Sequence, residues 1–188
     1  MDLEKVFNEF QSVETGKMRL RKLRPEDAPD FFQYYSNEVV YRYLNWNGPS
    51  TLEHAYEIIE TWNQGPKEGR ILCFAIADLE TDKIIGSISL GGFEGRMAEV
   101  GYELSAEFWR RGIMSDAIHE ILAIGFNQLD LLRIHAFVSL ENEASTFLLK
   151  KLGFQFEGRL RLFDCHLVTG ECRDADMYSL LKDEFCAK

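Results

Sequence analysis

Hydrophobic residues recur along the chain at two spacings, one typical of amphipathic helices and the other of half-buried strands. Helical spacing predicts five helices, at residues 2–10, after Pro25, from 51 to about 63, after Gly112, and from about 142 to 152. Alternating spacing predicts seven strands: residues 18–23, 71–79, 83–90, 97–105, 132–140, 154–166 and 172–181. Gly91-Gly92 is expected to interrupt or bulge its strand, and Gly153 lies where a helix commonly ends.

The order strand, helix, strand between residues 97 and 140 predicts a parallel pair with a right-handed crossover. Hairpin signals on either side favour antiparallel pairing elsewhere. The crossover helix has one apolar face, formed by Met114, Ala117, Ile118, Ile121, Leu122 and Gly125. We therefore expect a single α/β domain over residues 1–188, with residues 1–16 as a helical extension. Its sheet should be mixed and mostly antiparallel, with about seven strands and helices on both faces.

A candidate ligand-binding segment lies where the crossover helix begins. The segment Trp109-Arg110-Arg111-Gly112 leads directly into Ile113-Met114-Ser115. A helix N-terminus exposes unpaired N–H groups and a partial positive charge, and nearby arginine side chains add to it. The segment is therefore suited to a phosphate or pyrophosphate, although a solvated surface turn would have the same composition. Neither a GxGxxG nor a GxxxxGK[ST] motif is present.

Charge narrows the choice of partners. The 188 residues include 31 acidic and 21 basic ones, which gives a formal net charge of −10. This argues against generic nucleic-acid binding, which depends on neutralising phosphates. It is compatible with a cationic substrate, and equally with a role in solubility alone.

The cysteines and the lengths of the apolar runs indicate in which cellular compartment the protein is expected. No run of roughly 18 apolar residues predicts a membrane span, and the N-terminus lacks the pattern of a secretory signal. The four cysteines form no CxxC pair. We therefore expect reduced thiols, a cytoplasmic protein and no metal site.

Three segments follow one another in the second half of the chain. They are Ala98-Glu99-Val100-Gly101-Tyr102-Glu103-Leu104 before the Trp109–Gly112 turn, Leu132–Ala136 before Asn142-Glu143-Ala144-Ser145, and Lys151-Leu152-Gly153-Phe154 with Glu157-Gly158. In order and spacing they resemble the GNAT superfamily of acyl-CoA-dependent N-acetyltransferases. The Asn-x-x-Ser, Gly-Phe, Glu-Gly succession is most similar to the RimJ/RimL subgroup, which acetylates ribosomal-protein N-termini.

The resemblance implies acetyl-CoA as co-substrate, with no metal, and a splay between the two parallel strands that receives the pantetheine arm. Backbone groups of the first strand and of the helix start would bind the arm and the pyrophosphate. The implied cofactor-binding residues are Tyr102, Glu103, Leu104, Arg110, Arg111, Gly112, Ile113, Met114, Ser115 and Asn142. Two positions depart from the superfamily pattern, because Trp109 replaces a usual Gln or Arg and Met114 replaces a small residue. Met114 fits the buried helix face, so its N–H is expected to stay free.

Acetyl transfer to an amine needs a neutral nitrogen. An α-amine has a pKa of about 7.7–8.0 and a lysine about 10.4, so an N-terminal acceptor needs only a modest base or a water relay. Glu99 occupies the position of the strand glutamate that is the base in histone-acetylating relatives, and Asp164 the position of a carboxylate proposed for RimL-like enzymes. Each is equally a candidate for a purely structural or substrate-binding role.

Protonation of the leaving thiol needs an acid. Many superfamily members carry a tyrosine four residues before the Gly-Phe pair, where this chain has Leu149. Ser145 is the RimL-like substitute, and its alternative role is a helix-start hydroxyl that binds backbone. Asn142 is expected to cap the same helix.

The leading hypothesis is an acetyl-CoA-dependent N-acetyltransferase that acts on a protein N-terminus, such as that of a ribosomal protein. The alternatives are a small amine as acceptor, such as a polyamine, aminosugar, amino acid or drug, and a non-catalytic CoA-binding sensor. No nucleic-acid or membrane partner is expected. A homodimer is compatible with the family.

Overall fold

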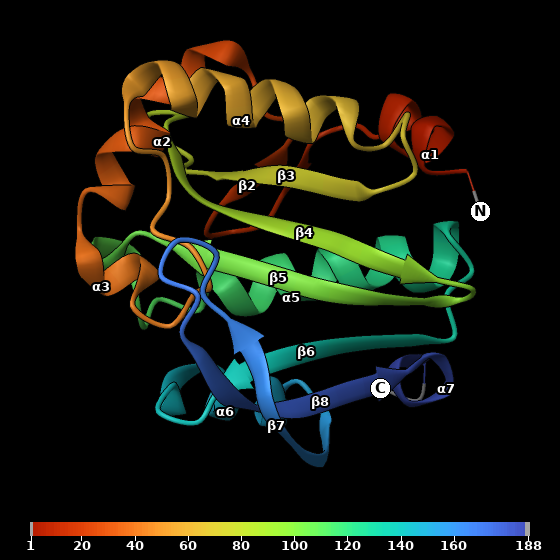
Figure 1. The fold of residues 1–188 in the computed structure, drawn as a ribbon. Helices are drawn as coiled ribbons and strands as arrows, with labels where there is room; N and C mark the ends of the chain where they lie inside the picture. Colours follow the sequence, from red (N-terminus) through yellow and green to blue (C-terminus); the bar gives the residue numbers. More distant parts are fainter. Residues whose placement is uncertain (1, 187–188) are drawn as a thin grey trace.

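The strands join in one eight-stranded sheet (Figure 1). Its order is β1 (Val13–Glu14), β2 (Arg19–Arg21), β3 (Ile71–Ala77), β4 (Ile84–Glu94), β5 (Met97–Leu104), β6 (Arg133–Ser139), β8 (Cys172–Leu181) and β7 (Gln155–Cys165). Among the strands that the structure describes, β5 and β6 alone pair in parallel. The computed structural model describes residues 2–186. It confirms the mixed sheet and its parallel pair, and it adds β1, whose two residues are too short for an alternating pattern.

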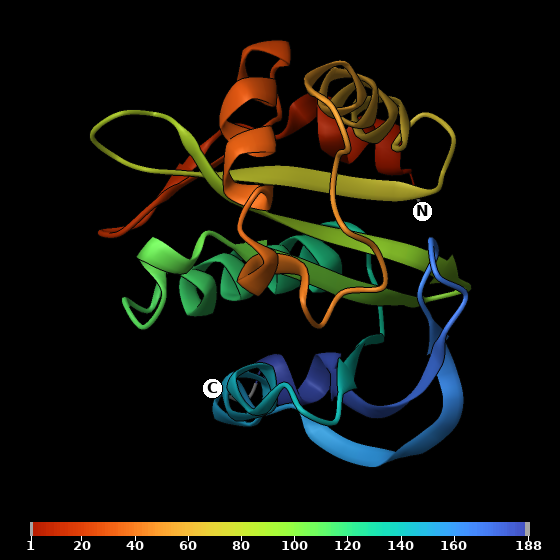
Figure 2. The ribbon, with the colours of Figure 1, turned by 60° about the vertical axis from the view of Figure 1, so that its left-hand side comes forward.

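Helices cover both faces of the sheet, as predicted (Figure 2). One face carries α2 (Ala28–Tyr35) and α4 (Leu52–Gln64), and the other carries α1 (Leu3–Glu9) and α5 (Ile113–Ala123). The shorter helices are α3 (Glu38–Tyr41), α6 (Glu143–Lys151) and α7 (Lys182–Cys186). Single turns at Pro25–Asp27, Ala106–Phe108 and Ile124–Gln128 complete the helical segments.

The core lies in two layers because strand side chains alternate between the faces. On β3, Leu72, Phe74 and Ile76 pack towards α1 and α5, whereas Cys73 and Ala75 pack towards α2 and α4. The apolar face predicted for α5 is buried, including Met114 at 9% exposure. The side chain of Met114 therefore packs in the core, and only the backbone of this residue lies at the helix start.

Short sequence patterns that mark bulges, helix starts and the N-terminal extension can be compared directly with the structure. The Gly91–Glu94 segment interrupts the β4–β5 register, and Gly92 has a φ of 55°, so the expected bulge is present. Thr51 caps α4 by accepting a hydrogen bond from the N–H of His54. In the N-terminal extension, Leu3–Glu9 is helical, while Val13–Glu14 forms a strand rather than a helix.

The expectation of reduced thiols is wrong for two of the four cysteines. Cys165 and Cys172 are cross-strand partners at the turn end of the β7–β8 hairpin and form a disulfide. Facing positions on paired strands bring the two sulfur atoms together, which a spacing of seven residues does not reveal. Cys73 and Cys186 are free. Among residues 2–186, no helix is long and apolar enough to cross a membrane.

Candidate active site

The parallel strands β5 and β6 separate along their length. They pair only where Met97, Ala98 and Glu99 lie beside Arg133, Ile134 and His135, and both strands then continue apart (Figure 1). The edge of β5 from Val100 to Leu104 therefore has no strand partner on its β6 side. Such an edge binds an extended ligand through backbone hydrogen bonds, as an added strand would. The predicted splay is present.

Trp109 takes part in shaping the end of this opening. Its indole N–H donates to the carbonyl of Leu104 at 2.8 Å. One backbone group of the predicted Tyr102–Leu104 binding edge is therefore already occupied. The unusual tryptophan therefore holds the turn against β5.

The start of α5 is the predicted anion site. Gly112 precedes the helix with a φ of 77°, and Arg110 also has a positive φ of 62°. The side chains of Arg110 and Arg111 are exposed, and the Arg111 guanidinium lies 5.1 Å from the ring centre of Phe108. The side chains of Ile113 and Met114 are buried in the core, so they do not cover the start of the helix. The backbone N–H groups of the first turn are therefore available to a ligand.

A further cation that the sequence did not reveal reaches this site. Lys17 pairs with Asp116, in the first turn of α5, at 3.1 Å between Nζ and Oδ1. A methyl group built on Gly112 would lie 3.1 Å from the same Nζ. Lys17 therefore adds its charge to those of Arg110 and Arg111 at the helix start. Lys17 and Asp116 lie 99 positions apart, so no local pattern relates them.

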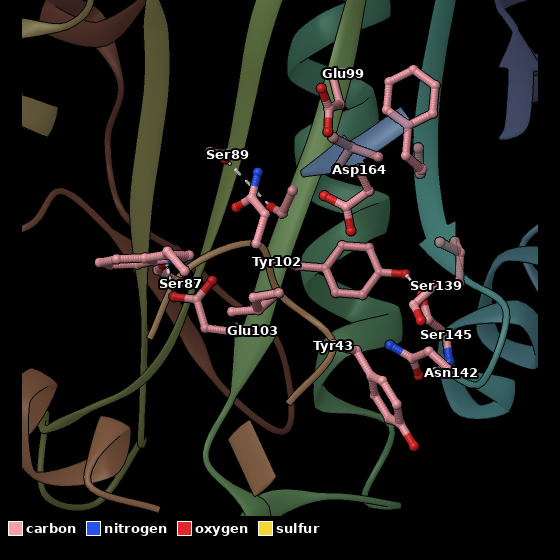
Figure 3. A pocket seen from close by; sticks show the side chains of 18 of the residues that line it. Tyr43, Ser87, Ser89, Glu99, Tyr102, Glu103, Ser139, Asn142, Ser145 and Asp164 are labelled. Atoms are coloured by element: carbon pink, nitrogen blue, oxygen red, sulfur yellow. Dashed lines mark hydrogen bonds between the residues drawn. The ribbon is translucent and has the colours of Figure 1, made fainter. Parts of the chain in front are cut away.

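The splay opens into a cavity of about 560 Å³ between the sheet and the segment that follows α3 (Figure 3). Its floor is polar, with Glu99 and Glu103 from β5 and Ser87 and Ser89 from β4. The volume is within the range of small-molecule sites. The structure brings all three predicted catalytic residues, Ser145, Asp164 and Glu99, to this one cavity.

Ser145 and Tyr102 face each other across the splay. Their hydroxyl oxygens are 2.6 Å apart, and the side chain of Asn142 accepts a hydrogen bond from the Ser145 N–H at 3.1 Å. Asn142 thus caps α6 as predicted. Burial raises the pKa of Tyr102 to about 12, against the opposite effect of the Ser145 hydrogen bond. The pair keeps its protons at neutral pH.

The two candidate bases differ in their partners. Burial, followed by the charge of Asp164, raises the pKa of Glu99, and no ion pair of residues 2–186 involves Glu99. Asp164 is bound by Arg173 at 2.8 Å, and that arginine also donates to the carbonyls of Tyr43 and Leu44. Glu99 is therefore the carboxylate that is available to take a proton. Asp164 is occupied in tying β7 to the segment after α3.

A third carboxylate, Glu103, was expected to contribute only backbone groups. Its Oε1 accepts hydrogen bonds from Ser87 and, at 3.1 Å, from Tyr34. Burial outweighs these hydrogen bonds and raises the pKa of Glu103 to about 7. Alternation along β5 was the available signal, because it puts Glu103 on the same face as Glu99.

The family model described as an acetyltransferase (GNAT) domain matches residues 17–155. The chain belongs to the GNAT acetyltransferases. An uncharacterized N-acetyltransferase of Bacillus subtilis, YoaA, is 36% identical over 92% of this chain and 98% of its own. The putative ribosomal N-acetyltransferase YdaF of the same organism is 35% identical over 54% of this chain and 56% of its own.

A solved structure has the same fold. The ribosomal L7/L12 α-N-protein acetyltransferase RimL in complex with coenzyme A superposes with a TM-score of 0.81, over 93% of this chain and 99% of that one, at 19% identity. Proteins with the GNAT fold use acetyl-CoA. This chain is accordingly an acyl-CoA-dependent N-acetyltransferase, and its splay and helix start have the features such a co-substrate needs.

Proposed function

We propose that this enzyme transfers the acetyl group of acetyl-CoA to the α-amine of a protein N-terminus. The observation that carries the proposal is the meeting of Glu99, the Tyr102–Ser145 pair and the unpaired edge of β5 in one cavity. An acceptor held there lies beside both a base and an acid, and proximity of two bound reactants supplies much of the rate.

Each group at the cavity has its own part in the reaction. Glu99 takes the proton of the amine, directly or through a water molecule, while the nitrogen forms its bond to the thioester carbonyl carbon. The free N–H groups on the β6 side of β5 stabilise the oxygen as it gains charge. As the carbon–sulfur bond breaks, the Tyr102–Ser145 pair donates a proton to the leaving sulfur. The amine proton and the thiol proton balance, so no covalent enzyme intermediate is needed.

An α-amine fits this machinery because its pKa lies near neutrality. A half-buried glutamate with a raised pKa, such as Glu99, is a modest base, adequate for such a nitrogen. The putative ribosomal activity of YdaF supports a protein acceptor. A small cationic amine is the second candidate, supported by three carboxylates around one cavity in a chain of net charge −10.

A thiol-release assay separates these acceptors. The purified enzyme is given acetyl-CoA with peptides from ribosomal-protein N-termini in one series and with polyamines and aminosugars in another. We expect the peptides to be used with the higher kcat/KM, and mass spectrometry to place the acetyl group on the α-nitrogen. Faster turnover of the small amines would overturn the protein acceptor, and release without any acetylated amine would overturn the transferase assignment.

A further inference from the structure

The deep end of the cavity has a binding feature that acetyl transfer does not use. Both hydrogen bonds to Glu103, from Ser87 and from Tyr34, end on Oε1. Within residues 2–186, Oε2 receives no hydrogen bond that meets ordinary geometry. A half-buried carboxylate with one engaged and one open oxygen presents a directed acceptor to the cavity that it lines.

A second buried group beside Glu103 is also open. Tyr35 is 3% exposed, and its hydroxyl has no hydrogen-bond partner among the described residues. The charge of Glu103 raises the pKa of Tyr35, after burial itself, so the two groups are close enough to interact. The Tyr35 hydroxyl faces Glu103 and Trp46 but makes no hydrogen bond of ordinary geometry with either, and a buried polar atom left in this state is rare in folded proteins.

Aromatic rings form the wall above this carboxylate. Trp46 and Trp62 line the cavity with ring centres 6.2 Å apart, and Trp46 lies 5.1 Å from the ring of Tyr35. Aromatic faces attract cations, and the attraction strengthens where water is excluded. A cavity lined by an open carboxylate oxygen and by two tryptophans matches an ammonium or guanidinium group.

We propose that Glu103, with Tyr35 and the Trp46–Trp62 wall, is a subsite for a positively charged group of the acceptor other than the reacting amine. The subsite rests on the proposed acetyl transfer and adds a preference for one class of acceptor. Adjacent side chains on β5 point to opposite faces, so Tyr102 reaches towards Ser145 while Glu103 reaches towards Ser87 and α2 (Figure 3). The preferred acceptor therefore has two nitrogen centres, one that reacts and one that remains charged.

The charged group can come from a small diamine or from the first side chain of a peptide, and two matched pairs distinguish these sources. One pair is 1,4-diaminobutane and 4-aminobutan-1-ol, and the other is a peptide that begins with arginine and its counterpart that begins with citrulline. Each pair differs only in the second charge. We expect the charged member of at least one pair to have a kcat/KM about tenfold higher at pH 8, as charge-assisted hydrogen bonds provide. The pair that shows the preference identifies the source.

Glu103→Gln should abolish that preference through the KM for the acceptor and leave the KM for acetyl-CoA unchanged. Glutamine resembles the protonated carboxyl and keeps an oxygen for Ser87 and Tyr34, so the fold should persist. Tyr34→Phe retains the charge and should keep the preference. Glu57→Gln, on the exposed side of α4, is the matched control. A wild-type enzyme that turns over both members of both pairs equally, or a Glu103→Gln enzyme that still prefers the charged members, would overturn the subsite.

A binding measurement keeps this test independent of turnover. With coenzyme A present, the charged member of the favoured pair should raise the melting temperature of the wild type more than its neutral partner does, and Glu103→Gln should remove the difference. If no amine is acetylated but this difference is observed, the proposed function fails and the subsite stands. If amines are acetylated and the wild type shows no such difference for either pair, the subsite fails alone.

Discussion

The hydroxyl of Tyr102 on β5 lies 2.6 Å from the hydroxyl of Ser145 on α6, so one hydrogen bond joins β5 to α6 beside the splay. This contact joins two roles that the sequence analysis kept apart. Ser145 was the candidate acid, and Tyr102 was assigned to the cofactor through its backbone alone. Because the pKa of Tyr102 is raised to about 12, the tyrosine can hold its proton and orient the serine hydroxyl towards the leaving sulfur.

Replacing either partner should slow the reaction without weakening cofactor binding. Ser145→Ala and Tyr102→Phe should each lower kcat by about 10²-fold, the lower range for general acid–base catalysis. Because the two hydroxyls act as a unit, the double variant should lose little more than either single one. Steady-state kinetics and a coenzyme A titration measure both effects. Unchanged turnover in Ser145→Ala would remove this serine from the mechanism.

The acid limb of the pH–rate profile should report Glu99. Burial and the charge of Asp164 raise its pKa, so kcat/KM falls as pH decreases through that raised value and Glu99 becomes protonated. Asp164→Asn removes the negative neighbour and leaves Arg173 nearby, and both changes favour the charged form of Glu99. The limb should therefore move to lower pH in Asp164→Asn and disappear in Glu99→Gln. If Asp164→Asn abolished turnover while Glu99→Gln preserved it, the base would be Asp164.

Coenzyme A affinity should respond in opposite directions to the two members of the Lys17–Asp116 pair. Lys17→Ala removes a cation from the start of α5 and leaves the Asp116 carboxylate unpaired beside the phosphates, so Kd should rise several-fold. Asp116→Asn frees Lys17 and removes the repulsion, so Kd should fall. Isothermal titration at low and high salt measures both, and salt should reduce the differences. Lys67→Ala, at an exposed position, is the control, and equal Kd values in all variants would exclude Lys17 from the site.

Prediction from sequence succeeded where local chemistry decides the structure. The apolar spacing of α5, the Asn142 cap and the bulge after Gly91 depend on residues a few positions apart, so their patterns are readable. The family motifs added the splay, which no periodicity encodes.

The remaining features depend on contacts between distant segments. Lys17 reaches Asp116, and Arg173 reaches the carbonyls of Tyr43 and Leu44, because the sheet order brings those segments together. The open oxygen of Glu103 follows from which neighbours satisfy the other oxygen, which is a property of packing rather than of composition. The cross-strand disulfide likewise depends on the register of β7 and β8.

Stability should depend on one buried ion pair beneath the start of α2. Arg21 is 3% exposed and Asp27 5%, and two hydrogen bonds of 2.7 and 2.8 Å join them. Asp27→Asn removes the two-bond partner of the guanidinium, which keeps only the Asp82 carboxylate at 3.2 Å as counter-charge, and should lower the free energy of unfolding by about 2–3 kcal/mol. Urea unfolding measures the loss. Glu26→Gln, at the exposed neighbouring position, should have little effect, and similar midpoints for both variants would show that the pair contributes no net stability.

The Cys165–Cys172 disulfide should affect how tightly the cavity binds the acceptor and leave the binding of acetyl-CoA unchanged. The tip beyond Cys165–Cys172 contacts the segment after α3, with the Leu167 N–H donating to the carbonyl of Asn45 at 2.7 Å and the His166 ring 3.0 Å from the Asn47 side-chain oxygen. Reduction frees the two strands at the base of this tip. The KM for the acceptor should therefore rise while the KM for acetyl-CoA stays constant.

Kinetics with and without a phosphine reductant tests this in the wild type and in a Cys165→Ser/Cys172→Ser variant. The reductant should affect only the wild type, whose reduced form should match the variant, because the free thiols Cys73 and Cys186 are present in both. Thiol alkylation of the unfolded chain should label two cysteines before reduction and four after it. Four labelled cysteines before reduction would show that the bond does not form, and an acceptor KM insensitive to reduction would show that the tip does not shape the cavity.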